Sequence, residues 1–199
     1  MKRFVSSWTL SLAVALVLVV VPAMAQQTQA PLRSPDVIFV PTPPEVVKAM
    51  LETARVGKND IVYDLGSGDG RIAIAAVKDF NAQRSTGIDI DPQRIKEATA
   101  NLAAAEKEKP GISKQVRFLN QDLFATDISE ATVVTLYLLP SLNVKLIPQL
   151  EKLKPGSRIV SHSFDMEGVE PDKIERVKTE DGDERTVYLW TVPLEKESK

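Results

Sequence analysis

Three glycines, Gly66, Gly68 and Gly70, stand at alternate positions between an apolar run and a helix-forming segment. The apolar run, 60–65 (DIVYDL), predicts a short buried strand, and 71–80 predicts a helix. Glycine removes side chains from a turn, so a ligand can lie against the backbone. A helix start also offers free N–H groups to an anionic group. The segment therefore predicts a strand–turn–helix unit with a ligand site at the turn.

The rest of the chain continues this alternation of strands and helices. Further strands are predicted at 85–90, 115–120, 131–139 and 158–164, with helices at 91–107 and 143–153. Asp91 is expected to cap the first of these helices. A closing antiparallel pair is predicted at 174–178 and 186–192, around the turn at Asp181 and Gly182. Strands that alternate with helices indicate an α/β fold, with a mainly parallel sheet covered on both faces.

A further helix is predicted ahead of the first strand. Thr42 would cap it, Pro43 would be its first residue, and Glu45 would complete a capping box. Gly57 would end it.

Composition excludes several classes of protein. The chain has 199 residues, of which 43% are hydrophobic and 26% charged, with a formal net charge of −2. These values fit a globular domain and disfavour a dedicated nucleic-acid binder, which carries a basic excess. The absence of cysteine excludes a thiolate metal site and a cysteine nucleophile. With His162 as the single histidine, no metal site is predicted, and we interpret His162 as structural rather than as a base.

The N-terminal 25 residues have the pattern of an export signal. Lys2 and Arg3 precede 14 uncharged residues (8–21), and 23–25 (AMA) is a small-x-small cleavage site. An uncleaved anchor is the alternative, and it would be the only membrane contact expected. We predict a signal at 1–25, a flexible tether at 26–39, a domain at 40–194 and a tail at 195–199. The domain would be periplasmic or secreted, or cytoplasmic if the hydrophobic start is a mis-annotated extension.

Acidic residues follow the predicted strands at suitable places for a ligand. Asp64 directly precedes the glycine turn, where a carboxylate would repel a pyrophosphate and attract an ammonium group. Asp89 ends the second strand and could accept hydrogen bonds from ribose hydroxyls. Asp122 follows the third strand and could accept from an adenine amino group. The glycine spacing is also not the G-x-G-x-x-G of dinucleotide sites. Together these residues describe a ligand with an ammonium end, a ribose and an adenine.

In these motifs the sequence resembles the class I (seven-strand) S-adenosylmethionine-dependent methyltransferases. DLGSGDGR is similar to that family's first motif, GIDIDP to its second and NQDLF to its third. The resemblance covers about 40–192 and implies a three-layer αβα, Rossmann-like, seven-stranded sheet with an antiparallel C-terminal hairpin. It also implies S-adenosyl-L-methionine as cofactor. The implied cofactor residues are Asp64, Gly66, Ser67, Gly68 and Gly70 for the methionine part, Asp89 for the ribose, and Ile90, Asp122 and Leu123 for the adenine.

A narrower resemblance concerns the acceptor. The run 40–47 (VPTPPEVV) followed by VYDLGSGDGR is similar to the archaeal seven-strand protein-lysine methyltransferases. It is also similar to the mitochondrial enzymes that methylate lysines of ATP synthase and of the adenine nucleotide translocase. The segment 137–142 (YLLPSL) fits that group and departs from the Asn-Pro-Pro-Tyr signature of enzymes acting on exocyclic or amide nitrogens. The resemblance implies methylation of a protein lysine, with Tyr137 as the candidate for lining the acceptor site and no obligatory catalytic base.

Three alternatives remain open from the sequence. The domain could be an exported, non-catalytic module that binds a nucleoside-like ligand on a methyltransferase fold. It could instead methylate a small molecule. An NAD(P)-dependent oxidoreductase is a third possibility, which the glycine spacing and Asp64 disfavour.

Overall fold

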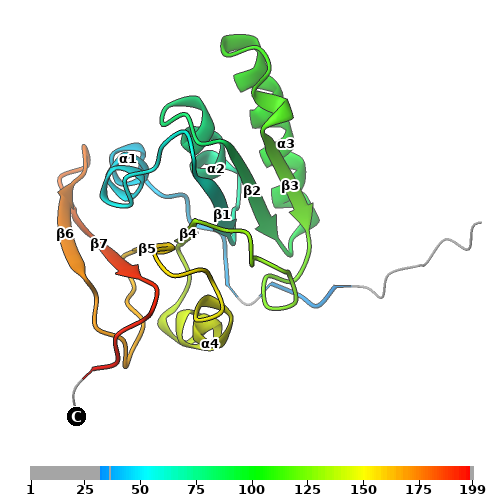
Figure 1. The fold of residues 1–199 in the computed structure, drawn as a ribbon. Coiled ribbons are helices and arrows are strands. Elements are labelled where there is room, and N and C mark those ends of the chain that lie inside the picture. Colours follow the sequence, from blue (N-terminus) through cyan, green and yellow to red (C-terminus); the bar gives the residue numbers. More distant parts are fainter. Residues whose placement is uncertain (1–31, 36, 198–199) are drawn as a thin grey trace, which may run out of the picture. The chain divides into compact units, whose positions relative to one another are not determined.

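The described part of the chain in this computed structural model comprises residues 32–35 and 37–197, which belong to one compact unit. The predicted signal at 1–25 lies outside the described residues, as does the first part of the predicted tether. Figure 1 shows the described unit as a twisted sheet with helices packed against it.

The sheet has seven strands in the order β3-β2-β1-β4-β5-β7-β6. Their bounds are β1 Ile61–Leu65, β2 Arg84–Asp89, β3 Val116–Asn120, β4 Val133–Leu136, β5 Arg158–His162, β6 Lys173–Lys178 and β7 Glu184–Thr191. The strands β1 to β5 pair in parallel, whereas β7 runs antiparallel to both β5 and β6. This confirms the predicted mainly parallel sheet with an antiparallel C-terminal pair. The strand order reverses between β1 and β4, where α/β folds bind ligands.

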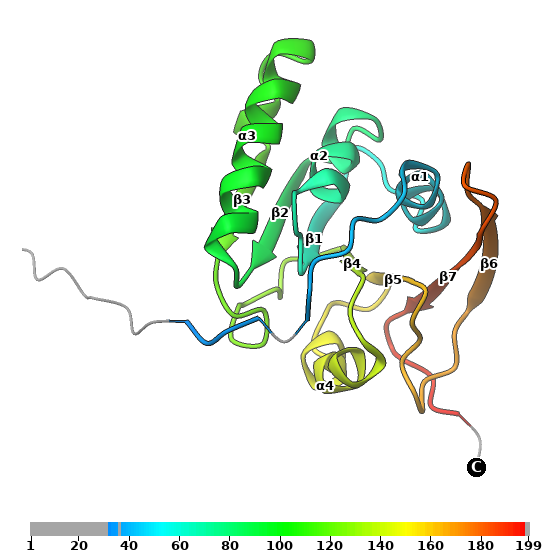
Figure 2. The ribbon, with the colours of Figure 1, turned by 180° about the vertical axis from the view of Figure 1, so that it is seen from behind.

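Helices cover both faces of the sheet, as predicted (Figure 2). The α-helices are α1 Pro44–Thr53, α2 Arg71–Lys78, α3 Pro92–Glu108 and α4 Pro140–Leu150, and a short 3₁₀ turn spans Ile112–Lys114. Neighbouring residues of a strand point to opposite faces. Val62 therefore packs in the core formed with α1, α2 and α3, while Leu65 packs in the core formed with α4. The predicted three-layer αβα architecture is confirmed.

The start of α1 differs from the predicted capping box. Pro43 occupies the cap position and Pro44 the first turn, and no side chain caps the helix. The Thr42 hydroxyl instead lies 3.2 Å from His162 Nδ1, and a Glu45 carboxylate oxygen accepts from the backbone N–H of Glu180. Both side chains that would form the local capping box therefore interact with residues far along the chain.

Three element boundaries, at the ends of β4 and β5 and at the start of α4, were also predicted wrongly. The strand predicted at 131–139 ends at Leu136, and α4 begins at Pro140 rather than at 143. A proline in the first turn has the fixed φ of a helix and needs no N–H partner there, which favours the early start. The strand predicted at 158–164 ends at His162, because Ser163 turns the chain with a φ of +62°.

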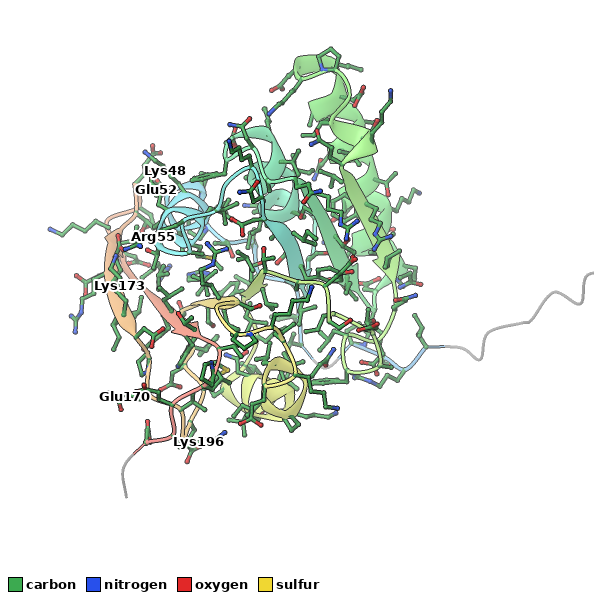
Figure 3. All side chains as sticks on the ribbon, in the orientation of Figure 1. Lys48, Glu52, Arg55, Glu170, Lys173 and Lys196 are labelled. Atoms are coloured by element: carbon green, nitrogen blue, oxygen red, sulfur yellow. The ribbon has the colours of Figure 1, made fainter. Side chains whose placement is uncertain are left out.

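The edge formed by α1 and β6 carries mainly charged side chains. Thr53 Oγ1 donates to a Glu175 oxygen at 2.7 Å, which links α1 to β6, and Lys173 pairs with the same oxygen at 2.7 Å. Figure 3 shows Lys48, Glu52, Arg55 and Lys173 along this edge, away from α3. Charged side chains protect an edge strand from pairing with another chain. Among the described residues, no helix has the length and apolar character needed to cross a membrane.

Among the described residues, α4 is the one α-helix on its face of the sheet, so a buried residue of α4 tests the packing of that core. Leu150 is fully buried, whereas Val144 on the same helix is 37% exposed. We expect Leu150→Ala to lower the free energy of unfolding by about 2–5 kcal/mol, because the cavity it leaves cannot close fully. The matched control Val144→Ala should change it by less than about 1 kcal/mol. Urea denaturation followed by circular dichroism measures both, and equal effects would contradict the packing described.

Candidate functional site

A cleft of about 100 Å³ lies at the carboxyl ends of β1, β2 and β4. The structure brings most of the predicted site residues to this one place. Its lining includes eight of them: Asp64, Gly66, Ser67, Asp89, Ile90, Asp122, Leu123 and Tyr137. The remaining two, Gly68 and Gly70, shape the turn beneath the cleft.

The glycine turn leaves the end of β1 and is hydrogen-bonded to the end of β2. The backbone N–H groups of Gly66 and Ser67 donate to the Ile88 carbonyl at 2.9 and 3.0 Å. Gly70 caps α2 with a φ of +80°, a conformation that residues with side chains rarely adopt. At Gly68 a Cβ atom would lie 2.1 Å from the ring of Phe39, so a side chain there would displace that ring. The turn thus leaves its backbone close to the cleft.

Asp64 carries a buried carboxylate with one free oxygen. Its side chain is 2% exposed, and Oδ1 accepts a hydrogen bond of 2.7 Å from Thr135 Oγ1. Oδ2 has no partner among the described residues, and neither has the buried Ser67 hydroxyl. Burial raises the pKa of Asp64 to about 7, and the nearby carboxylates of Asp89 and Asp69 add to the rise, while the Thr135 hydrogen bond and the nearby backbone N–H of Ala73 oppose it. A cationic ammonium group at this position would satisfy the free oxygen.

Asp89 is held by the backbone on both oxygens. Oδ2 accepts from the Gly68 N–H at 2.8 Å and Oδ1 from the Asp91 N–H at 2.9 Å. Burial raises its pKa, although these two hydrogen bonds oppose the rise. Each carboxylate oxygen keeps a further lone pair, so the group can still accept from a pair of hydroxyls. Asp91 caps α3 through the Gln93 N–H at 2.8 Å, which confirms the predicted cap.

Asp122 is engaged by a residue from the predicted tether. Arg33 Nε donates to Asp122 Oδ2 at 2.8 Å, and Arg33 Nη2 donates to Oδ1 at 3.3 Å. The guanidinium lowers the pKa of Asp122, which stays ionised at neutral pH. Arg33 thus pairs with the carboxylate that the sequence predicts to accept a hydrogen bond from an adenine amino group.

The described residues 32–35 and 37–42, here called the N-terminal strap, lie along the cleft. In Figure 2 the blue part of the strap passes the carboxyl ends of β1 and β2 on its way to α1. Phe39 covers Gly68, and the Arg94 guanidinium lies 4.9 Å from the centre of the Phe39 ring. Arg71 Nη1 donates to the Thr42 carbonyl at 2.9 Å. With the strap in place, the cleft is well below the 300–1,000 Å³ or so typical of ligand pockets.

Sequence reasoning missed the strap as part of the site. Arg33 and Phe39 act through partners far along the chain, which no local pattern reveals. The only signal was the run 40–47, whose resemblance to lysine methyltransferases extends the similarity ahead of the first strand. Among the described residues, no cluster of histidine, aspartate and glutamate could hold a metal ion.

A family model for the ANTKMT methyltransferase domain matches residues 64–173, from the end of β1 to the start of β6. The chain belongs to this family. It is therefore a class I, seven-strand, S-adenosylmethionine-dependent methyltransferase, as the sequence motifs implied.

Curated relatives extend the similarity to nearly the whole domain. This methyltransferase is 49% identical over 160 residues to a protein-lysine N-methyltransferase from Saccharolobus islandicus, a match that covers 79% of this chain and 95% of that one. It is 30% identical to a lysine N-methyltransferase of Xenopus laevis that is named for ATP synthase, over 79% of this chain and 67% of that one.

A solved structure shares both fold and sequence. It is described as an RNA methyltransferase from Salinibacter ruber in complex with S-adenosyl-L-homocysteine. The match has a TM-score of 0.70 and 49% identity, and it covers 80% of this chain and 97% of that one. The described residues of the cleft fit this group, because the free Asp64 oxygen and the bare turn suit an amino acid moiety. The assignment of individual contacts to the cofactor stays a prediction.

The pKa of Asp64 leads to a pH-dependent affinity. An Asp64 with a pKa of about 7 is mostly neutral at pH 6 and mostly ionised at pH 8. Because only the ionised form pairs with the ammonium group, we expect S-adenosylhomocysteine to bind about tenfold more tightly at pH 8 than at pH 6. Asp64→Asn should weaken binding at least about tenfold at pH 8 and abolish this trend. Calorimetry measures both. A trend that survives in Asp64→Asn but vanishes in Asp89→Asn would assign it to the other carboxylate.

The Arg33–Asp122 pair leads to a prediction with a clear sign. Removing the guanidinium frees Asp122, so Arg33→Ala should bind S-adenosylhomocysteine more tightly, by up to about fivefold for an exposed pair. Arg33→Lys keeps the charge and should give a smaller change, while the distant Arg176→Ala should give none. Calorimetry at low and high salt tests this, since salt weakens the competing pair. Weaker binding in Arg33→Ala would mean that Arg33 contacts the cofactor instead.

Proposed function

We propose that this methyltransferase methylates the side-chain nitrogen of a protein lysine. The supporting observation is the 49% identity to the Saccharolobus islandicus protein-lysine N-methyltransferase over 95% of its length. The 30% identical Xenopus laevis relative, which is also a lysine N-methyltransferase, points the same way. The lysine nitrogen, once it has given one proton to water, attacks the methyl carbon that S-adenosylmethionine supplies. The carbon–sulfur bond breaks with its electron pair left on sulfur, and the product nitrogen carries the positive charge as a methylated ammonium group.

The residues of the site contribute position and a dry environment. Asp64, Asp89 and Asp122 hold three separate parts of an elongated ligand, which fixes its orientation along the cleft. Positioning of two reactants can lower a barrier by roughly 7–11 kcal/mol. The lysine must lose its proton before it attacks, and apolar surroundings lower the pKa of an amine. The cleft offers such surroundings through Phe39, Leu138 and other apolar side chains. No side-chain base is required.

RNA is a second candidate acceptor, because the Salinibacter ruber protein is described as an RNA methyltransferase at the same identity of 49%. The charge of this chain favours the protein acceptor. A formal net charge of −2 supplies no basic excess for a phosphate backbone. Asp165 and Glu167 are exposed after β5, where they would repel RNA and attract a lysine.

A labelling experiment separates these acceptors. The purified domain is incubated with methyl-labelled S-adenosylmethionine and, separately, soluble protein, membrane protein, total RNA and a small-molecule extract from the source cells. We expect label in protein, released as methyl-lysine after acid hydrolysis, and at least about tenfold less with Asp64→Asn. Label in RNA alone would replace the lysine proposal with the second candidate. Tight cofactor binding without label in any fraction would support a non-catalytic module, and label in small molecules alone would support a small-molecule methyltransferase.

We also propose that the domain is exported, on the basis of the basic start, the apolar run and the small-x-small site at 23–25. Mass spectrometry of the N-terminus, on protein from fractionated cells, tests this. A periplasmic form beginning at Gln26 is expected. A periplasmic form that keeps residue 1 would indicate an anchor, and a cytoplasmic form would contradict export.

A further inference from the structure

Three aromatic rings meet at the carboxyl ends of β4 and β5, beside the cofactor residues. The Tyr137 ring centre lies 3.9 Å from that of His162 and 6.0 Å from that of Phe164, at interplanar angles of 32° and 19°. Tyr137 lines the cleft, and Tyr137 and Phe164 are both partly exposed, whereas His162 is 1% exposed. One ring of this stack is therefore sealed in the protein, and two reach the surface.

A strained turn brings the rings of His162 and Phe164 to the same partner. Ser163 has a φ of +62°, which is uncommon and unfavourable for a residue other than glycine. Ser161 Oγ fixes the turn by donating to the Phe164 carbonyl at 2.6 Å. The buried Asn143 amide on α4 donates to the Phe164 and Asp165 carbonyls at 3.3 and 3.0 Å. Backbone strain held by several side chains is typical of functional sites.

His162 supports the stack as an uncharged ring. Its Nδ1 lies 3.2 Å from Thr42 Oγ1 on the strap, and its buried Nε2 has no partner among the described residues. Burial, together with the charge of Arg185, lowers the pKa of His162 to about 4. The imidazole is therefore neutral at physiological pH and places no positive charge beside a cationic cofactor. The same bond ties the stack to the strap that borders the cleft.

We propose that Tyr137 and Phe164 form the subsite for the acceptor lysine, and that His162 is the positioning residue that holds the Tyr137 ring in place. This rests on the proposed lysine methylation. Tyr137 lines the same cleft as Asp64, so the subsite adjoins the methyl donor. The face of an aromatic ring can pack against the apolar methylene chain of a lysine and can attract the positively charged nitrogen of the methylated product. Asp165, directly after Phe164, is exposed and adds a negative charge next to it that would attract a lysine.

The subsite is tested by Phe164→Leu, which keeps an apolar side chain and removes the ring. The acceptor is the protein fraction in which the wild type deposits methyl-lysine, and the KM is expressed as total protein concentration. We expect Phe164→Leu to raise this KM about fivefold, as expected for a lost cation–π contact of about 1 kcal/mol. The affinity for S-adenosylhomocysteine should stay within twofold. Phe164→Tyr should restore the KM, and Phe80→Leu, another partly buried phenylalanine, should leave it unchanged. An unchanged KM in Phe164→Leu would overturn the subsite.

The positioning role of His162 has its own readout. His162→Ala should lower kcat at least about tenfold with little change in the KM for S-adenosylmethionine, because Tyr137 loses its support. His162→Phe, which keeps a ring at this place, should recover most of kcat. Equal losses in the two variants would overturn this role. Where His162→Ala does not fold, Thr42→Val tests the support through the lost hydrogen bond, and an unchanged kcat contradicts it. If the wild type labels RNA alone, the proposed lysine methylation itself is wrong. That outcome can be told apart from a failure of the subsite or of the role of His162.

Discussion

The buried carboxylate of Asp64 is the interaction on which the site depends. It sits at the end of β1, where the strand order reverses, and parallel pairing places Thr135 of β4 directly opposite. The Thr135 hydroxyl satisfies one oxygen and leaves the other without a described partner. A buried carboxylate with an unpaired oxygen is unfavourable unless a cation pairs with it. The fold therefore keeps a site that a cationic group of the ligand would complete. The neighbouring turn carries glycine at three alternate positions, so its backbone can lie close to that ligand.

Much of this arrangement could be predicted from the sequence, because its causes are local. Alternating strands and helices indicate the parallel sheet, and a carboxylate at the end of a parallel strand must lie at the ligand-binding edge. That argument predicts Asp64, Asp89 and Asp122 close together, and the structure brings all three to one cleft. Their individual contacts with the cofactor remain predictions.

What could not be predicted depends on partners far apart in the chain. Thr42 and Glu45 have the spacing of a capping box. Thr42 instead lies within hydrogen-bond distance of the buried His162, and Glu45 accepts from a backbone N–H ahead of β7. Arg33 has no local pattern at all, and it finds Asp122 only because the strap runs along the strand ends. The end of β5 follows from the unusual φ of Ser163, which a serine does not signal in a sequence. In each case tertiary contacts outweigh local preference.

The strap also brings the first described residues of the domain to the cleft. Arg33 lines the cleft and pairs with Asp122, so the described part of the chain begins at the carboxyl ends of the parallel strands. The β6 edge and the C-terminal strands lie on the other flank of the molecule. A tag fused directly to Leu32 would therefore start beside the predicted cofactor site, whereas one fused after Glu197 would start on the flank that carries β6 and β7.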